Sequence, residues 1–346
     1  MKKQILFTLV FISFFYSCKN ALQKNEIVIY WKDAPLSLNA LVPINNSEVH
    51  FDRMIFQRLF DIDYSSDTLC YVLNRITTNF KRTVFPIENK VTCRLRKDAT
   101  WDNGEIISMD DAMCSLKIAL CSTGIFEVEN SSKQPLKFVE FNSDSNYMFT
   151  LCFDSSFKSD DFAHAQFFVL PEKEIDPNKI LAKHEINYWI QHYDSLAQLP
   201  EVKKVLADAL SPEKFYSGSG PYKVDAWKKD SLLVLSFKHN WWGSNYKFAN
   251  CYFNNYPNKL IYHFNWKNDE LEKILLEQKA DVVEGLDSEI FRQLEKNSAI
   301  TANYIFLDDD RINRCNIFSK RLGPRYHCNQ FPGFWEPDFN LSVKTN

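Results

Sequence analysis

The stretch GSGPYKVDAW, residues 218–227, combines a glycine turn with the start of a strand. Two glycines flank Ser219, Pro221 follows, and from Tyr222 onward side chains of two kinds alternate. The chain has only eight glycines in 346 residues, so two within three positions need a reason. One reason is turn geometry, since glycine accepts a positive φ and proline supports a sharp bend. The other is close approach, in which another group lies directly against the backbone.

The amino terminus has the layout of an export signal. Two lysines precede an apolar run over residues 5–15, which is too short to cross a bilayer as a helix. A small serine and Cys18 follow this run, as in lipoprotein signals. We therefore predict that residues 1–17 are a signal peptide, that Cys18 is acylated, and that residues 18–25 form a polar tether. The alternative is plain cleavage, with Cys18 incidental.

Bulk composition limits the classes of function. The net charge is −3 and the basic residues are scattered, so nothing points to a nucleic-acid partner. Aromatic residues make up 15% of the chain, which provides apolar area for a sizeable core. After the amino terminus no apolar run approaches about eighteen residues, so we expect no membrane-spanning helix there. A chain of 346 residues is long enough for two domains.

No group of residues has the spacing of a catalytic or metal-binding site. The nine cysteines include no C-x-x-C pair, which argues against a zinc or thioredoxin-like site. His184 and His192 fall close to one helix face, but Tyr188 and Trp189 between them favour packing over metal ligation. We therefore expect no catalytic residue, no metal and no cofactor.

Apolar periodicity predicts strands and helices in alternation. Period-two patterns predict strands over residues 26–31, 89–101, 146–154, 231–239 and 259–266. Helical spacing predicts helices over residues 50–63, 108–121, 197–210 and 269–280. Ser108 and Asp111 have the spacing of a capping box at the start of the second helix. Because both kinds of element alternate without an internal repeat, the predicted class is α/β, or α+β, with mixed sheets.

Three stretches together resemble a known family. They are LRKDATWDNGEIISMDDAMCSLK (95–117), GSGPYKVDAWKKDSLLVLSFKHNWWG (218–243) and LEKILLEQKADVVEGLDSEIFRQLEK (271–296). Their order and separation are similar to those of the family 5 extracellular solute-binding proteins, the oligopeptide- and dipeptide-binding components of ABC importers. The resemblance covers about residues 26–300. It includes PLSLNAL (35–41), where Asn39 and Ala40 replace the Asp-Pro that is usual in the family.

The resemblance implies the first lobe of a type II periplasmic-binding-protein-like fold, with the second lobe largely missing because family members are usually much longer. We expect a core domain built from residues 26–63 and 200–307, with an inserted subdomain over residues 64–199. Residues 308–346 lose the family pattern, and we expect an irregular tail there, as in a truncated or frameshifted product.

The resemblance also implies a function without enzymatic activity. The chain would be an extracytoplasmic lipoprotein at the cell envelope that binds a peptide or similar small solute for an ABC permease. Candidate ligand contacts are the connector after PLSL and the glycine turn, although an ordinary loop explains each equally well. These candidates are Pro43, Ile44, Asn45, Asn46, Ser47, Gly218, Ser219 and Gly220. The alternative is a truncated remnant that binds no peptide, or a lobe that contacts another protein.

Membrane anchorage through Cys18 leads to a first prediction. Mass spectrometry of protein from the membrane fraction should find a processed chain that begins with an acylated Cys18, because the serine-cysteine pair ends a short apolar run. A Cys18→Ser variant should remain unprocessed or leave the membrane fraction. An unmodified mature amino terminus would contradict the prediction.

Overall fold

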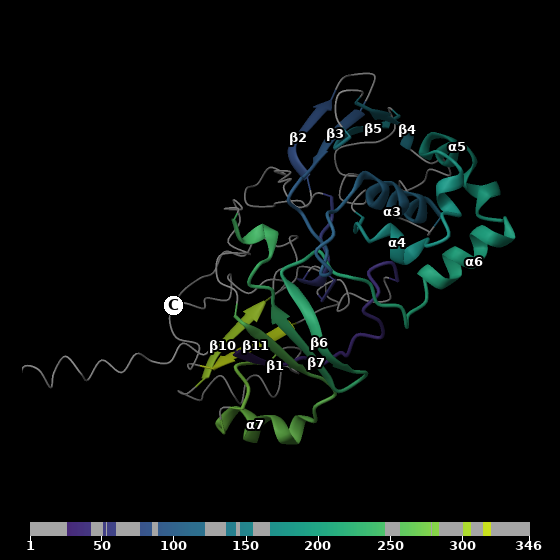
Figure 1. Ribbon diagram of the computed structural model, residues 1–346. Helices are drawn as coiled ribbons and strands as arrows, with labels where there is room; N and C mark the ends of the chain where they lie inside the picture. Colours follow the sequence, from purple (N-terminus) through teal and green to yellow (C-terminus); the bar gives the residue numbers. More distant parts are fainter. Residues whose placement is uncertain are drawn as a thin grey trace, which may run out of the picture.

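Two β-sheets and the helices around them form the described part of the chain (Figure 1). The structure is a computed structural model. It describes residues 26–42, 51–52, 54–59, 77–84, 89–121, 136–142, 146–154, 167–245, 257–277, 279–283, 300–305 and 314–319. The predicted class of mixed α/β sheets is confirmed.

The larger sheet has seven strands, and β1 lies in its interior. In spatial order the strands are β10 (Ile300–Ile305), β11 (Arg314–Ser319), β9 (Val282–Val283), β1 (Glu26–Tyr30), β8 (Lys259–His263), β7 (Leu232–Phe237) and β6 (Tyr222–Lys228). Strand β1 is parallel to both of its neighbours, β8 and β9. The remaining pairs are antiparallel.

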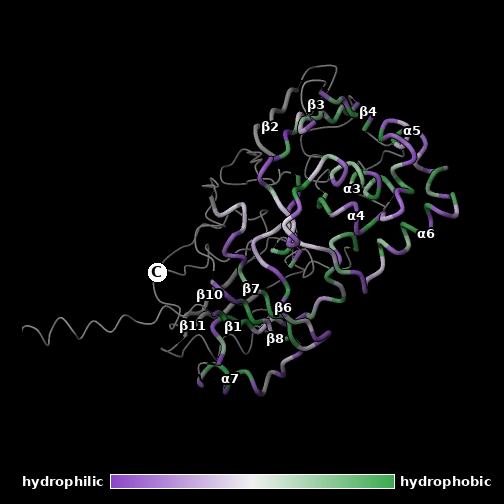
Figure 2. The backbone as a smooth tube through the Cα atoms, in the orientation of Figure 1, coloured by the Kyte–Doolittle hydropathy of each residue, from purple (hydrophilic) through white to green (hydrophobic). Residues whose placement is uncertain are grey.

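Alternating side chains on these strands build one half of the core. Ile27 and Ile29 on β1 are fully buried, while Val28 between them is only partly buried. Tyr262 on β8 lies opposite Ile29 and packs edge-on against Phe51, with ring centroids 4.9 Å apart. Hydrophobic residues run along β7, as expected of a strand inside a sheet (Figure 2). This face of the sheet therefore anchors the segment that contains Phe51.

The smaller sheet has four strands and carries most of the helices. Its spatial order is β2 (Thr77–Val84), β3 (Asn89–Leu95), β5 (Met148–Phe153) and β4 (Leu136–Phe141), all antiparallel. Helices α3 (Met109–Cys121), α4 (Glu172–Ile175), α5 (Ile186–Leu196) and α6 (Pro200–Ala209) lie on this side of the molecule, with the 3-10 turn η2 (Leu181–Lys183) (Figure 1). Helix α7 (Asn268–Leu276) lies beside the larger sheet (Figure 1), and the 3-10 turn η3 (Trp242–Asn245) follows β7 in the chain.

The capping box predicted at the start of α3 is confirmed. The backbone N–H of Ser108 donates to Asp111 Oδ2 at 2.7 Å, and the N–H of Asp111 donates to Ser108 Oγ at 3.2 Å. The second carboxylate oxygen of Asp111 accepts the backbone N–H of Glu172 at 2.7 Å. One side chain therefore caps α3 and fixes the start of α4 beside it.

The helix predicted over residues 50–63 is wrong at residues 56–59, and residues 50, 53 and 60–63 lie outside the described ranges. Helical backbone is described at residues 51–52 and 54–55, and none of residues 56–59 is helical. Arg58 forms a β-bridge with Phe168, and the carbonyl of Gln57 accepts the N–H of Val169 at 3.2 Å. These tertiary partners use the backbone groups that a continuing helix would need, so amphipathic spacing alone misled the prediction.

The irregular tail predicted over residues 308–346 also needs correction. Residues 314–319 form β11, which pairs with β10 and β9; the other residues of the tail lie outside the described ranges. The division into a core and an inserted subdomain remains a prediction. Helix α6 contacts α4 and lies with the helices beside the smaller sheet (Figure 1). None of the helices in the described ranges has the length and apolar character needed to span a bilayer.

The connector after β1 is tied to the end of α6 by buried Asn39. Its side-chain N–H₂ group donates to the carbonyls of Ala209 and Ser211 at 2.7 and 2.9 Å. Its side-chain oxygen accepts the N–H of Leu41 at 3.0 Å. Only an amide can donate and accept in this way, since an aspartate carboxylate has no hydrogen to give.

This geometry predicts that Asn39→Asp is strongly destabilising. The introduced carboxylate would face two carbonyl oxygens in a buried site, so we expect the free energy of unfolding to fall by about 3 kcal/mol. Asn103→Asp is a matched control, because Asn103 is exposed and only accepts a hydrogen bond, from Glu105. Denaturant titration of both variants checks the difference, and equal costs would contradict it.

Candidate functional site

The glycine turn lies directly against the backbone of residues 54–57. The N–H of Gly220 donates to the carbonyl of Ile55 at 2.7 Å, and the N–H of Gln57 donates to Ser219 Oγ at 2.8 Å. A Cβ atom added to Gly218 would lie 2.5 Å from the Ile55 carbonyl oxygen. One added to Gly220 would lie 2.4 Å from the carbonyl oxygen of Met54. No side chain fits at either position.

Close approach, and not a positive φ, therefore explains the two glycines. Among the described glycines only Gly104 has a positive φ, at 83°. The chain that approaches Gly218 and Gly220 is the protein's own, at residues 54–57. The turn is thus a packing contact between residues 218–220 and residues 54–57.

Two tryptophans also bond to the glycine turn. Trp241 and Trp242 donate their indole N–H groups to the carbonyl of Ser219, at 2.9 and 3.1 Å. Both rings are buried, so they pack within the protein. Ser219 is fully buried, and its carbonyl oxygen therefore accepts two hydrogen bonds inside the protein.

Asp102, in the loop between β3 and α3, contacts both the glycine turn and Lys238. The N–H of Gly218 donates to Asp102 Oδ2 at 2.9 Å, and Lys238 Nζ donates to Asp102 Oδ1 at 2.5 Å. Burial lowers the pKa of Lys238, although the charge and hydrogen bond of Asp102 act in the opposite direction. Asp102 therefore connects a loop near α3 with the strands of the larger sheet.

Three of the eight predicted ligand contacts lie within the described ranges. Gly218, Ser219 and Gly220 are buried, and their described contacts are all with the protein itself. The connector over residues 43–47 and the acylation site Cys18 lie outside the described ranges. Ligand binding by the eight candidate residues and acylation of Cys18 therefore remain predictions.

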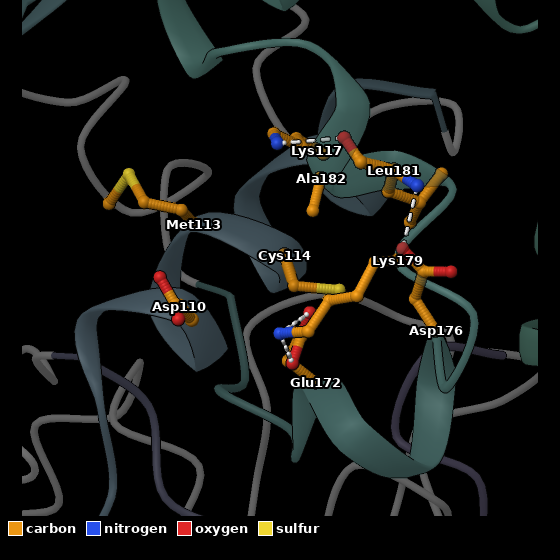
Figure 3. Close-up of a pocket in the computed structure, with 9 residues that line it drawn as sticks. All are labelled: Asp110, Met113, Cys114, Lys117, Glu172, Asp176, Lys179, Leu181 and Ala182. Atoms are coloured by element: carbon orange, nitrogen blue, oxygen red, sulfur yellow. Dashed lines mark hydrogen bonds and ion pairs between the residues drawn. The ribbon is translucent and has the colours of Figure 1, made fainter.

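A pocket of about 90 Å³ lies between α3 and the segment from α4 to η2 (Figure 3). It is lined by charged and apolar side chains: Asp110, Met113, Cys114, Lys117, Glu172, Asp176, Lys179, Leu181 and Ala182. We refer to it as the α3–α4 pocket. Its volume suits a few water molecules or one small charged group.

Charged groups in the α3–α4 pocket are held by specific partners. Lys117 Nζ donates to the carbonyls of Leu181 and His184, at 2.9 and 2.8 Å. Burial lowers the pKa of Lys117, although nearby charges, among them that of Asp176, raise it. Asp176 accepts the N–H groups of Ile180 and Leu181. Lys117 and Asp176 therefore shape the η2 segment that forms one wall.

Metal binding has no support in the described part of the chain. No group of three metal-ligating residues occurs there. Tyr188 lies between His184 and His192, with ring centroids 5.2 and 4.4 Å from theirs. The two imidazoles therefore flank a phenol ring.

The α3–α4 pocket was not predicted from the sequence. One signal was available, because Lys117 interrupts an otherwise apolar or small face of a predicted helix. A lysine at such a position needs buried acceptors, but the sequence does not show that the carbonyls of Leu181 and His184 supply them. The wall from residue 172 to residue 182 comes from a distant part of the chain.

Comparison with protein families identifies the chain. Residues 87–318 match the bacterial extracellular solute-binding proteins, family 5 Middle, which is more than half of the chain. The chain belongs to the family 5 extracellular solute-binding proteins. The expected family is confirmed, and with it the expectation of a binding protein that is not an enzyme. A search of curated proteins finds no match.

Solved structures share the fold of this family 5 protein over about half of their own length. An oligopeptide-binding protein from Thermus thermophilus, complexed with a pentapeptide, is 14% identical with a TM-score of 0.57; the match covers 82% of this chain and 49% of that one. The oligopeptide-binding protein AppA from Bacillus subtilis, in complex with a nonapeptide, is 15% identical with a TM-score of 0.52 and covers 81% and 47%. The periplasmic EDTA-binding protein EppA is 17% identical with a TM-score of 0.55 and the same coverage.

The close approach at the turn predicts unequal effects of alanine at two glycines. Gly220→Ala should lower the free energy of unfolding by about 3 kcal/mol, because its Cβ would overlap backbone atoms of Met54 and Ile55. Gly104→Ala is the control. Its added Cβ would have no heavy atom within 4 Å, so the free energy of unfolding should fall only by the cost of the positive φ, about 1 kcal/mol. Denaturant unfolding of both variants measures the difference. A Gly104 variant as unstable as the Gly220 variant would contradict the packing role.

Proposed function

We propose that this family 5 protein is the extracytoplasmic binding component of an ABC importer and takes a peptide or a similar small solute. In this proposal Cys18 anchors it to the membrane as a lipoprotein, and an ABC permease is its partner. The observation that carries the proposal is the match of residues 87–318 to the family. The same family gives no reason to expect catalysis.

Peptides are favoured as the solute by the proteins that share the fold. Relatives from Thermus thermophilus, Bacillus subtilis and Helicobacter pylori are described in complex with peptides. The ligands of other relatives are EDTA and mannopinic acid, so small polar solutes remain within the proposal. All of these relatives are under 20% identical to this chain, so a peptide ligand for this protein is a proposal.

Recognition of an extended peptide would depend on main-chain hydrogen bonds. The turn at residues 218–220 offers few, because the N–H groups of Gly218 and Gly220 and the carbonyl of Ser219 already bond to the protein. A bound peptide would have to form its hydrogen bonds with the backbone groups of the turn that remain. The connector over residues 43–47 is therefore the stronger candidate contact of the two.

Titration calorimetry with random tri- to pentapeptides tests the proposal. We expect saturable binding weaker than micromolar for the 346-residue chain. A net hydrogen bond contributes about 1 kcal/mol, so every bond that the occupied turn cannot offer costs up to about tenfold in affinity. A Gln191→Ala variant, altered at an exposed position of α5, is the control and should bind equally.

Two outcomes would change the functional conclusion. No heat of binding from any peptide at about 10 mM, a concentration that would detect an interaction worth about 3 kcal/mol, would reject peptide binding and favour a lobe that contacts another protein. Micromolar or tighter binding would show that this chain, alone or as two copies, encloses peptide on both sides.

A further inference from the structure

An ion pair between Lys179 and Glu172 forms part of the lining of the α3–α4 pocket. Lys179 Nζ lies 2.7 Å from each of the two carboxylate oxygens of Glu172. The side chain of Glu172 is only 6% exposed, whereas that of Lys179 is 56% exposed. The close-up shows the stem of Lys179 crossing the pocket beside Cys114 to reach Glu172 (Figure 3). A buried carboxylate is thus neutralised by a lysine that comes from the surface.

Glu172 is held in place independently of Lys179. Its backbone N–H donates to Asp111 Oδ1, and its backbone carbonyl accepts the N–H of Asp176 at 2.7 Å. Among the described residues, the carboxylate of Glu172 has Lys179 as its sole ion-pair and hydrogen-bond partner. If Lys179 swung outward, a positioned and buried carboxylate would remain without a counter-charge, which is strongly unfavourable.

The charges around the pocket favour a cation at this position. The hydrogen bond to Glu172 has the largest effect on the pKa of Lys179 and raises it; burial opposes this, and the charges of Glu172, Asp110 and Asp176 raise the pKa further. Without Lys179 the lining would carry these three carboxylates against the single ammonium of Lys117. Asp110 forms no hydrogen bond within the described part of the chain and is exposed at the rim, so it can attract a second positive charge.

The backbone of Lys179 is in the left-handed region, with φ of 56°. A non-glycine residue there carries a conformational cost, which persists only when surrounding contacts compensate for it. Two contacts of Lys179 are available to compensate: its N–H donates to the carbonyl of Asp176 at 3.0 Å, and its ammonium group pairs with Glu172. The ion pair with Glu172 is therefore one of the two contacts that hold this lysine in its left-handed conformation.

We propose that the α3–α4 pocket is a binding site for an unbranched primary ammonium group, with Lys179 as its tethered and displaceable occupant. Glu172 provides the counter-charge, and the walls at Met113, Cys114 and Leu181 accept a methylene chain like the lysine stem that now lies there. Polyamines and the side chains of peptide lysines share this chemistry. A branched α-ammonium group is wider than the stem that the pocket now holds.

An ammonium group fits this pocket better than a metal ion does. Both carboxylate oxygens of Asp176 accept backbone N–H groups, which leaves Glu172 as the one buried carboxylate among the described lining residues that is available to a ligand. Divalent cations in proteins need several oxygen ligands, and the described residues contain no group of three metal-ligating side chains. A single carboxylate in an apolar surround is enough for an ammonium ion.

Chemical rescue of Lys179→Ala tests the proposal. The variant lacks three methylene groups and the ammonium, which together correspond to n-propylammonium. Added n-propylammonium chloride should raise its melting temperature saturably, by about 3 °C at tenfold excess over Kd. Tetramethylammonium chloride at equal ionic strength should not, because its charge is shielded by methyl groups. Equal effects of the two salts would overturn the proposal.

Two further variants show that the effect arises at Glu172. Lys179→Ala combined with Glu172→Gln should lose the response to n-propylammonium. Lys214→Ala is a matched control, since Lys214 forms a 2.6 Å ion pair with exposed Asp208 and covers no buried carboxylate. It should not respond to either salt. A response of the double variant or of Lys214→Ala equal to that of Lys179→Ala would overturn the assignment.

The unaltered protein provides a test that does not depend on the stability of a variant. Titration with putrescine should shift the NMR signals of the Lys179 side chain, with an apparent Kd at least about tenfold weaker than that of the alanine variant because the tethered lysine competes. Comparing putrescine with N-acetyl-lysine amide separates polyamines from peptide lysines as the source. If neither shifts the Lys179 signals, the proposal is rejected.

Discussion

The structure depends on one contact, in which the glycine turn at residues 218–220 lies against the backbone of residues 54–57. Gly220 and Ser219 each form a hydrogen bond to that segment, and there is no space for a Cβ atom at either glycine. The same segment pairs on its other side with Phe168 and Val169, which precede α4. A short extended strip therefore connects the strands of the larger sheet with the helices beside the smaller one.

Directional polar groups, more than apolar area, determine how this junction is arranged. Asp102 accepts hydrogen bonds from Gly218 and Lys238, and the Ser219 carbonyl accepts two indole N–H groups. Burying such groups is costly unless each finds a partner, so few alternative arrangements of the two sheets would satisfy them all. Asn39 has the same effect at the end of α6. We infer that these contacts fix the geometry on which any ligand-binding surface must be built.

Family membership and the α3–α4 pocket rest on different observations, although the pocket residues lie within the matched range. The match to family 5 covers residues 87–318, and the chain spans about half the length of the solved structures that share its fold. Solute binding by the whole protein is therefore a proposal that the family supports. The pocket between α3 and α4 rests on local geometry, namely a buried carboxylate whose partner is a surface lysine. The two proposals can fail separately, because no residue of the pocket is a candidate peptide contact.

The sequence by itself determined those features that depend on neighbouring residues. Alternation of side chains located β1, β7 and β8, and the spacing of Ser108 and Asp111 located the start of α3. The order of three motifs was enough to indicate the family. Local patterns succeed here because strand alternation and helix capping are satisfied within a few residues of chain.

Only the tertiary structure decided features that need partners distant in the sequence. The helix expected over residues 50–63 ends early because Gln57 bonds to Ser219 and Val169. The role of Gly218 and Gly220 became clear only from the backbone that approaches them, and β11 is a strand because β9 and β10 lie beside it. In each case one segment has two acceptable conformations, and hydrogen bonds to a segment far along the chain select between them.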